Sequence, residues 1–248
     1  MSLSGKTALI TGGTKNLGKI TAIELASKEK CNLFLHHNSN QGDEEAFAKE
    51  LRDKYGVKVE LYQGKLGSQA SLTQLFDAAV ERMGRIDIAI NNVGKVLKKP
   101  FTEVTEEEFD EMDLVNNKVA FFFISESMKK VSDGGRIITL VTSLLAVYTP
   151  FYPVYQGTKA AVEYYTKAAS KELMARNITV NCVAPGPMDT PFFYAQETPE
   201  AVEFYKSNAL QQRLTDTRDI APIISFLATN GGWITGQVIF ANGGLAAN

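Results

Sequence analysis

The chain has 248 residues, of which 44% are hydrophobic and 22% are charged, and its formal net charge is −2. This composition is typical of a globular protein, and the small negative charge gives no support for binding a polyanion such as nucleic acid. The longest apolar runs, such as Val119 to Ile124, are far shorter than the roughly 20 residues that span a membrane.

In the first half of the chain, short apolar segments that predict strands alternate with segments whose apolar residues recur at helical spacing. The expected order is strand 6–11, helix 17–28, strand 31–36, helix 43–55, strand 57–62, helix 68–83 and strand 86–90. The last of these strands is almost wholly apolar, which is typical of a strand covered on both faces of a sheet.

The same alternation continues to the C-terminus. The expected order is helices 105–118 and 120–130, strand 136–141, helix 153–175, strand 178–183, helices 199–209 and 219–228, and strand 237–240. No linker or repeat divides the chain. We therefore predict a single doubly wound α/β domain of the Rossmann type over residues 1–248, with a parallel sheet of about seven strands and helices on both faces.

Two irregular segments, residues 144–152 and 185–198, interrupt the alternation and are rich in proline and aromatic residues. Both follow strands, so both should lie at the carboxyl edge of the sheet, where ligands bind in this architecture. We expect substrate loops at about 144–152 and 185–210. The expected substrate contacts are Tyr148, Phe151, Tyr152, Met188, Phe192, Phe193 and Tyr194.

Tyr155 and Lys159 are four residues apart on the predicted helix 153–175, so their side chains share one face. A phenol is a poor acid or base at neutral pH, but a nearby ammonium stabilises the phenolate and lowers its pKa. The pair could then exchange a proton with a carbonyl or alcohol oxygen. A tyrosine and a lysine at this spacing also arise by chance, so the pair gains weight only from the rest of the chain.

Glycines follow the first strand in the segment Thr11-Gly-Gly-Thr-Lys-Asn-Leu-Gly18. Such a turn lets a pyrophosphate approach backbone N–H groups at a helix N-terminus. A plain glycine turn is the alternative, but its position at the opening strand-to-helix turn favours a dinucleotide site. The second strand runs into His36-His37-Asn38-Ser39, without the acid that usually holds the ribose of NAD.

These segments together resemble the short-chain dehydrogenase/reductase family along almost the whole chain, and its 3-oxoacyl-ACP reductase-like members in particular. The family's turn TGxxxGxG is matched except at its middle glycine, where Asn16 stands; asparagine tolerates a left-handed backbone better than most residues. The matching residues are Thr11, Gly12 and Gly18 of this turn, Asn91, Asn92 and Gly94 of NNxG, Tyr155 and Lys159 of YxxxK, Pro185, Gly186 and Thr190 of PGxxxT, and Thr235, Gly236, Gln237, Asn242, Gly243 and Gly244 near the C-terminus.

The resemblance implies a catalytic set in which the tyrosine exchanges the proton and the lysine supports it. The family's catalytic serine has two candidates, because its usual position holds Thr142 while the local Thr-Ser-Leu-Leu pattern favours Ser143. We prefer Ser143. The implied catalytic residues are Asn116, which resembles the asparagine of the family's proton relay, Ser143 or Thr142, Tyr155 and Lys159.

The resemblance also implies a nicotinamide cofactor, and we expect NADP(H) to be preferred over NAD(H). No acid stands at the end of the second strand to repel a 2′-phosphate, and Lys65 replaces the acid that the family commonly has after the third strand. No arginine stands in the second-strand segment. The implied cofactor-binding residues are Gly12, Thr14, Lys15, Asn16, Leu17, Gly18, His37, Asn38, Ser39, Lys65, Leu66, Asn92, Val93, Gly94, Tyr155, Lys159, Pro185, Gly186, Met188 and Thr190.

The implied activity is reduction of a ketone, 3-oxoacyl or similar, to a secondary alcohol by hydride transfer from NADPH. The alternatives are an alcohol or sugar dehydrogenase that works in the oxidation direction, and a nucleotide-binding regulator without catalysis. The expected partner is a small carbonyl or alcohol molecule. Apolar surface at residues 121–123 and 162–165 favours pairing of copies of the chain, and we expect a homotetramer, with a dimer as second choice.

The remaining features are expected to be structural. Cys31 and Cys182 lie in apolar strand-like segments and predict buried free thiols, not a disulfide. With two histidines and two cysteines, we expect no metal site. The chain shows no signal peptide or C-terminal address motif, and we expect a cytoplasmic location.

Overall fold

Seven parallel strands form the centre of the molecule, in the order β3-β2-β1-β4-β5-β6-β7. The structure is a computed structural model, and it describes residues 2–39, 42–147 and 149–246. The strands are β1 (Thr7–Ile10), β2 (Asn32–His37), β3 (Val59–Gln63), β4 (Ile86–Asn91), β5 (Val131–Leu140), β6 (Thr179–Pro185) and β7 (Val238–Ala241). The predicted parallel sheet and its seven strands are confirmed.

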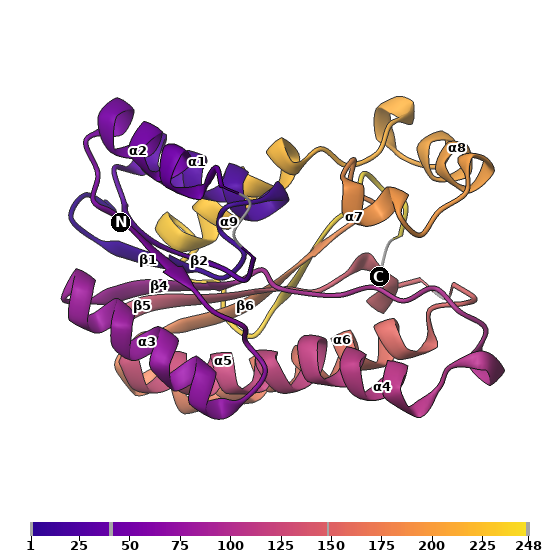
Figure 1. The fold of residues 1–248 in the computed structure, drawn as a ribbon, viewed down its shortest axis with the longest axis horizontal. Helices are drawn as coiled ribbons and strands as arrows, with labels where there is room; N and C mark the ends of the chain where they lie inside the picture. Colours follow the sequence, from indigo (N-terminus) through magenta and orange to yellow (C-terminus); the bar gives the residue numbers. More distant parts are fainter. Residues whose placement is uncertain (1, 40–41, 148, 247–248) are drawn as a thin grey trace.

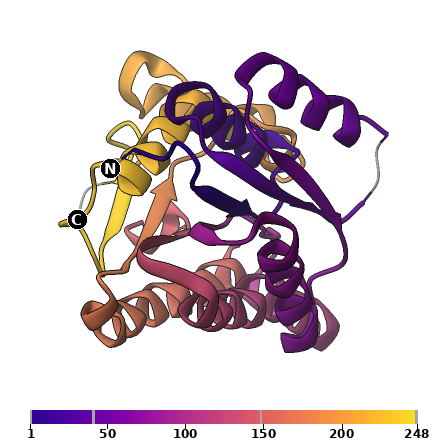
Figure 2. The same ribbon diagram turned by 90° about the vertical axis from the view of Figure 1, so that its left-hand side faces the viewer.

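Helices cover both faces of the sheet, as predicted (Figures 1 and 2). One face carries α1 (Asn16–Glu29), α2 (Glu44–Tyr55) and α9 (Thr217–Thr229), and the other carries α3 (Gln69–Met83), α5 (Val119–Lys130) and α6 (Pro153–Glu172). Toward the carboxyl ends of the strands lie α4 (Glu106–Asp113), α7 (Pro191–Tyr194) and α8 (Pro199–Ser207).

The two faces of the sheet are buried in two separate apolar cores. Along β2, Leu33 and Leu35 point into the core under α1, α2 and α9, whereas Phe34 between them points into the core under α3 and α5. Successive side chains of a strand alternate between faces, so a sheet covered on both sides needs apolar residues at every position. This is why the strands read as continuous apolar runs in the sequence.

Three local features differ from the expected elements. The two helices expected at 105–118 and 120–130 run on without a break, because a π-helical segment, Leu114–Lys118, joins α4 to α5. The segment expected to be irregular at 185–198 contains the short helix α7. Helix α6 ends at Glu172 instead of residue 175, and a 3₁₀ turn follows it.

Both cysteines are buried and unpaired, as predicted. Burial raises the pKa of Cys31 to about 12 and that of Cys182 to about 11, so both remain thiols at neutral pH. None of the described helices is both long enough and apolar enough to cross a membrane. In the described part of the chain, no three or more His, Cys, Asp and Glu side chains form a group that could hold a metal ion.

Large aromatic side chains are exposed on α5 and α6 and, on another part of the fold, on α9 and in the loop before β7. Phe121 of α5 is 46% exposed and packs edge-on against Tyr165 of α6 at 5.2 Å between ring centroids, and Tyr164 beside it is 68% exposed. Trp233 is fully exposed in the loop between α9 and the edge strand β7, and Phe226 of α9 is half exposed. A monomer gains nothing from exposing large apolar side chains in clusters.

Candidate active site

Helix α6 carries Tyr155 and Lys159 one turn apart at the carboxyl edge of the sheet, as predicted. The helix begins with Pro153, whose missing N–H is not needed at a first helical position. Both side chains are buried, with 9% of Tyr155 and 5% of Lys159 exposed. The Lys159 ammonium donates to the Leu140 carbonyl at the end of β5, at 2.9 Å.

Burial controls the acid strength of both groups. It lowers the pKa of Lys159 to about 8 and raises the pKa of Tyr155 to about 12, because a charge loses the stabilisation of water in either case. The pKa of Tyr155 is therefore raised and not lowered as expected: burial is the largest cause, and only the Thr142 hydroxyl opposes it. At neutral pH Tyr155 holds its proton and is available as a proton donor.

The two hydroxyl candidates take different roles in the structure. The Thr142 hydroxyl opposes the rise of the Tyr155 pKa and accepts from the Leu144 N–H at 3.3 Å. The Ser143 hydroxyl instead donates to the Ala184 carbonyl of β6 at 3.0 Å. Both hydroxyls line the same pocket, so the choice between them stays a prediction. In the proposal below we assign the orienting role to Thr142, because the Ser143 hydroxyl is engaged by the neighbouring strand.

Asn116 lies in the π-helical segment, behind Tyr155 and Lys159. Its amide oxygen accepts from the Lys95 N–H at 2.9 Å, and its amide nitrogen donates to the Lys95 carbonyl at 2.8 Å and to the Thr158 hydroxyl at 3.3 Å. A side chain at Gly94 would approach the Lys159 ammonium to 3.2 Å and the Asn116 oxygen to 3.4 Å. The site thus brings Gly94, Asn116 and Lys159 together, and a π-helical turn is common at functional sites.

The glycine turn between β1 and α1 is shaped to approach a ligand closely. Gly12 has a left-handed backbone, at φ +61°, and a side chain at Gly18 would collide with the Gly12 carbonyl at 2.1 Å. Asn16, at the place of the family's middle glycine, also has a positive φ of 44°. The first turn of α1 has no capping side chain and no acid. Its free N–H groups and positive dipole end fit a pyrophosphate.

The end of β4 is fastened beside this turn. The Thr11 hydroxyl donates to the Asn91 side chain and accepts from the N–H groups of Asn92 and Val93, at 2.9 and 3.3 Å. The Asn92 amide donates to the Gly12 carbonyl at 3.3 Å. The two motifs that the sequence separates by 80 residues therefore form one surface at the carboxyl edge.

His36 has a structural role that the sequence did not reveal. Its Nδ1 accepts from the Gly12 N–H at 3.2 Å, and its Nε2 donates to the Gly64 carbonyl at 2.7 Å. Burial lowers its pKa to about 4, so the ring is neutral at physiological pH. Both ring nitrogens are used by backbone groups, which excludes His36 as a phosphate ligand. Next to it, His37 is also buried and contacts the Ser39 carbonyl through Nδ1 at 3.2 Å.

Lys15, in the glycine turn, places its positive charge at the end of β2. The Lys15 ammonium donates to the Ser39 hydroxyl at 3.2 Å, and Asn38 and Ser39 are both exposed beside it. The sequence segment after β2 holds no cation, and Lys15 supplies one from 24 residues away. Lys65 is exposed without a described contact, and Leu66 is buried in the core against α3; their contacts with adenine stay predictions.

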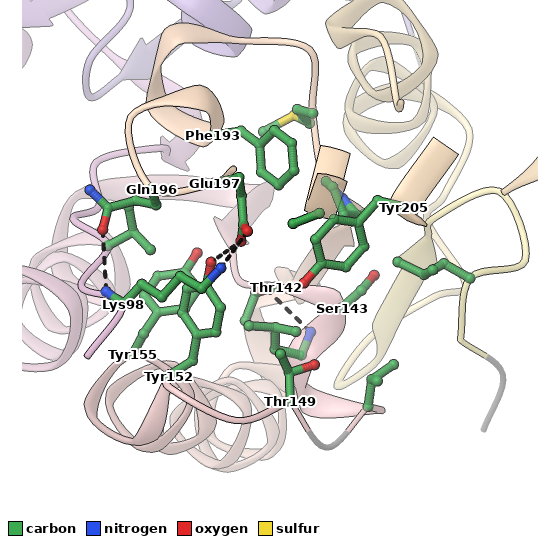
Figure 3. A pocket seen from close by; sticks show the side chains of 18 of the residues that line it. Lys98, Thr142, Ser143, Thr149, Tyr152, Tyr155, Phe193, Gln196, Glu197 and Tyr205 are labelled. Carbon is green, nitrogen blue, oxygen red and sulfur yellow. Dashed lines mark hydrogen bonds and ion pairs between the residues drawn. The ribbon is translucent and has the colours of Figure 1, made fainter. Parts of the chain in front are cut away.

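A pocket of about 700 Å³ lies at the carboxyl edge, and Thr142 and Tyr155 face into it (Figure 3). Both predicted substrate loops contribute to it. The predicted residues that line it are Ser143, Phe151, Tyr152, Pro185, Gly186, Met188, Thr190, Phe192 and Phe193. Tyr194 is not among its lining residues: its hydroxyl donates to Asp189 at 2.9 Å, and it borders a separate charged hollow. Tyr148 lies outside the described residues.

Sequence reasoning missed part of this pocket. Lys98 belongs to the segment after β4, which also lies at the carboxyl edge and could have been included by the same reasoning as the other loops. Helix α8 and the residues before it fall within the substrate loop expected at about 185–210, but none of these pocket residues was named as a substrate contact. The missed lining residues include Val96, Lys98, Gln196, Glu197, Phe204 and Tyr205.

Comparison with known proteins gives one consistent result. A family profile described as enoyl-(acyl carrier protein) reductase matches residues 13–246. A short-chain type dehydrogenase/reductase from Picea abies is 36% identical and covers 98% of this chain and 93% of its own length. A chloroplastic NADPH-dependent aldehyde reductase-like protein from Arabidopsis thaliana is 33% identical, with coverage of 98% and 95%.

Solved structures agree with these relatives. A Burkholderia cenocepacia protein described as a dehydrogenase, with bound NADP, is 48% identical, with a TM-score of 0.94 and coverage of 100% of this chain and 96% of its own. The angucycline C-6 ketoreductase LanV, also with bound NADP, is 32% identical, with a TM-score of 0.90 and coverage of 98% and 96%.

The different contacts of the Thr142 and Ser143 hydroxyls predict different effects when each is removed. We expect Thr142→Ala to lower kcat for carbonyl reduction at least about 100-fold, as removal of a donor to a developing oxyanion does. Thr142→Ser should retain most activity, and Ser143→Ala should stay within about tenfold of wild type because it removes a bond to backbone. Steady-state kinetics of the three variants check this, and the reverse order for the two alanine variants would contradict it.

Proposed function

The chain belongs to the short-chain dehydrogenase/reductase family, and from this premise we propose that it is an NADP(H)-dependent reductase that converts a ketone or a similar carbonyl to an alcohol. The observation that carries the proposal is the pair of hydroxyls, Thr142 and Tyr155, at one end of an otherwise largely apolar pocket. Two converging donors suit one carbonyl oxygen on which negative charge develops.

The chain's own residues would supply the proton and the orientation. Thr142 donates to the carbonyl oxygen and Tyr155 gives up its proton to that oxygen as the alcohol forms. Lys159, charged below its pKa of about 8, stabilises the phenolate left behind. Asn116 and the Lys95 carbonyl, next to Lys159, are placed to order a path by which the proton is replaced. The nicotinamide, when bound, supplies the hydride.

The cofactor would be held by backbone at the glycine turn and by side chains at the end of β2. The N–H groups at the start of α1 bind the pyrophosphate, and Gly94 lets the ribose approach Lys159 and Asn116. Lys15 and Ser39 bind the 2′-phosphate through a charge-assisted and a neutral hydrogen bond. The NADP bound to the Burkholderia protein and to LanV, and the NADPH named for the Arabidopsis relative, support this choice.

Tyr155 holds its proton at neutral pH, which fits the role of proton donor to the carbonyl oxygen. An alcohol or sugar dehydrogenase that works in the oxidation direction stays the alternative. A 3-oxoacyl substrate and a cytoplasmic location stay predictions. A nucleotide-binding regulator is disfavoured by the presence of Asn116, Tyr155 and Lys159 in one site.

The cofactor proposal predicts a preference for NADPH over NADH of at least about tenfold in kcat/KM, or about 1.4 kcal/mol. The measurement follows the absorbance of the reduced nicotinamide with a panel of aromatic and aliphatic ketones and aldehydes. Lys15→Met should lower kcat/KM for NADPH about tenfold and leave NADH nearly unchanged, because only NADPH carries the phosphate. Lys28→Met, at the other end of α1, is the matched control. Equal use of both cofactors, or no reduction of any carbonyl, would contradict the proposal.

We also propose a homotetramer, because the chain exposes two separate aromatic surfaces. A tetramer with closed two-fold symmetry uses two different interfaces, and a dimer uses one. Phe121 and Tyr164 would lie in the first, and Phe226 and Trp233 in the second. We expect sedimentation equilibrium to give a tetramer, and Phe121→Ser to give a smaller species. Phe101→Ser, at an exposed residue away from both surfaces, is the control. A wild-type monomer at micromolar concentration would refute the proposal.

A further inference from the structure

A buried ion pair forms one side of the substrate pocket, beside the catalytic tyrosine. The Lys98 ammonium lies 2.5 Å from the Glu197 carboxylate, and the Tyr152 hydroxyl donates to the other carboxylate oxygen. The Tyr152 and Tyr155 ring centroids are 6.2 Å apart. Figure 3 shows Lys98, Tyr152 and Glu197 converging at one place on the pocket wall.

Stability alone does not explain this pair. A buried ion pair often contributes little to folding, because desolvation of both charges offsets their attraction. The Glu197 side chain is 1% exposed, whereas the Lys98 side chain is 24% exposed and lines the pocket. An ammonium has three donors. Among the residues that the structure describes, Glu197 is the sole acceptor for this one, so donors remain toward the pocket.

The Lys98 ammonium is a charged donor in a pocket whose lining is otherwise mostly apolar. Most of the lining is apolar or aromatic, with side chains such as Leu144, Phe192, Phe193 and Phe204. Pockets of this kind use a few polar groups to fix the orientation of a ligand. The hydroxyls of Thr142 and Tyr155 are the first such group, and Lys98 with Glu197 is a second.

We propose, on the basis of the reductase function above, that Lys98 and Glu197 select the substrate: a neutral ketone that carries a second, uncharged oxygen acceptor. The Lys98 ammonium donates to this second oxygen while the first is reduced at Tyr155. A site built to hydrogen-bond a substrate group rejects analogues that lack it, since its own polar group is then left without a partner.

Glu197 sets the charge that the site accepts. It neutralises Lys98, so a substrate carboxylate would bring an unbalanced negative charge into an apolar pocket, which is costly. Without Glu197, the Lys98 ammonium would be unbalanced and would attract a carboxylate. The residue that excludes acids is therefore Glu197, and the residue that binds the second oxygen is Lys98.

The test uses three aryl ketones with equal numbers of heavy atoms: isohexanophenone, benzoylpropionamide and benzoylpropionate. They differ only in an isopropyl, amide or carboxylate end. At saturating NADPH, the wild-type kcat/KM should be highest for the amide, about tenfold above the isopropyl ketone, and lowest for the carboxylate. Calorimetric affinities for the complex with NADP⁺ should follow the same order.

Two single variants and their combination separate the roles. Lys98→Met should lower kcat/KM for the amide to the value for the isopropyl ketone. The value for the isopropyl ketone itself should change less than about threefold. Glu197→Gln should raise the ratio of kcat/KM for the carboxylate to kcat/KM for the amide by about tenfold or more. The double variant Lys98→Met/Glu197→Gln should lose that gain, because the gain depends on the ammonium. If the Lys98–Glu197 pair had only a structural role, the variants would lower kcat/KM for all three substrates to the same extent.

Matched controls lie on α8, which follows Glu197 in the chain. Glu203 and Lys206 form an exposed pair on α8 at 2.7 Å, and Glu203→Gln and Lys206→Met should leave all three ratios unchanged. Unaltered NADPH affinity and melting temperature show that each variant is folded. The inference would be overturned if the Lys98 and Glu197 variants lost kcat/KM equally for all three substrates. It would also be overturned if the amide-to-carboxylate ratio stayed unchanged both in kcat/KM and in affinity. Failure of the wild type to reduce or bind any of the three would overturn the inference and the reductase function together.

Discussion

Removal of water from the carboxyl edge of the sheet is the constraint on which the site depends. Burial raises the pKa of Tyr155 and lowers that of Lys159, so the tyrosine keeps its proton and the lysine is close to losing its own. Two cores that cover both faces of the sheet hold these groups in place. The protonation states of the two groups therefore follow from the packing around them.

The same edge is built from segments that are far apart in the chain. His36 fastens the glycine turn to the end of β3, Thr11 fastens it to the end of β4, and Asn116 fastens the segment after β4 to α6. Each connection uses a buried polar side chain whose hydrogen bonds are satisfied by groups from another segment. The cofactor surface and the substrate pocket thus share one rigid frame.

Sequence patterns predicted most of this arrangement and failed in specific places. The strands and their order of alternation with helices were predictable, because a sheet buried on both faces requires apolar runs. The choice between Ser143 and Thr142 stays a prediction, because local patterns do not show which hydroxyl a neighbouring strand engages. The structural role of His36 and the contact of Lys15 with Ser39 could not be predicted, since both arise between residues 24 positions apart. Glu197 had no local signal, as its partners Lys98 and Tyr152 lie 99 and 45 residues away.

The most direct measurement is the rate of carbonyl reduction by Tyr155→Phe, together with its NADPH affinity. The account predicts a kcat at least about 100-fold below wild type with unchanged NADPH affinity, because only the transferable proton is removed. Tyr165→Phe, on the same helix, should be unaffected. A Tyr155→Phe variant that keeps more than a tenth of wild-type kcat would place less than about 1.4 kcal/mol of the barrier on that hydroxyl and would contradict the account.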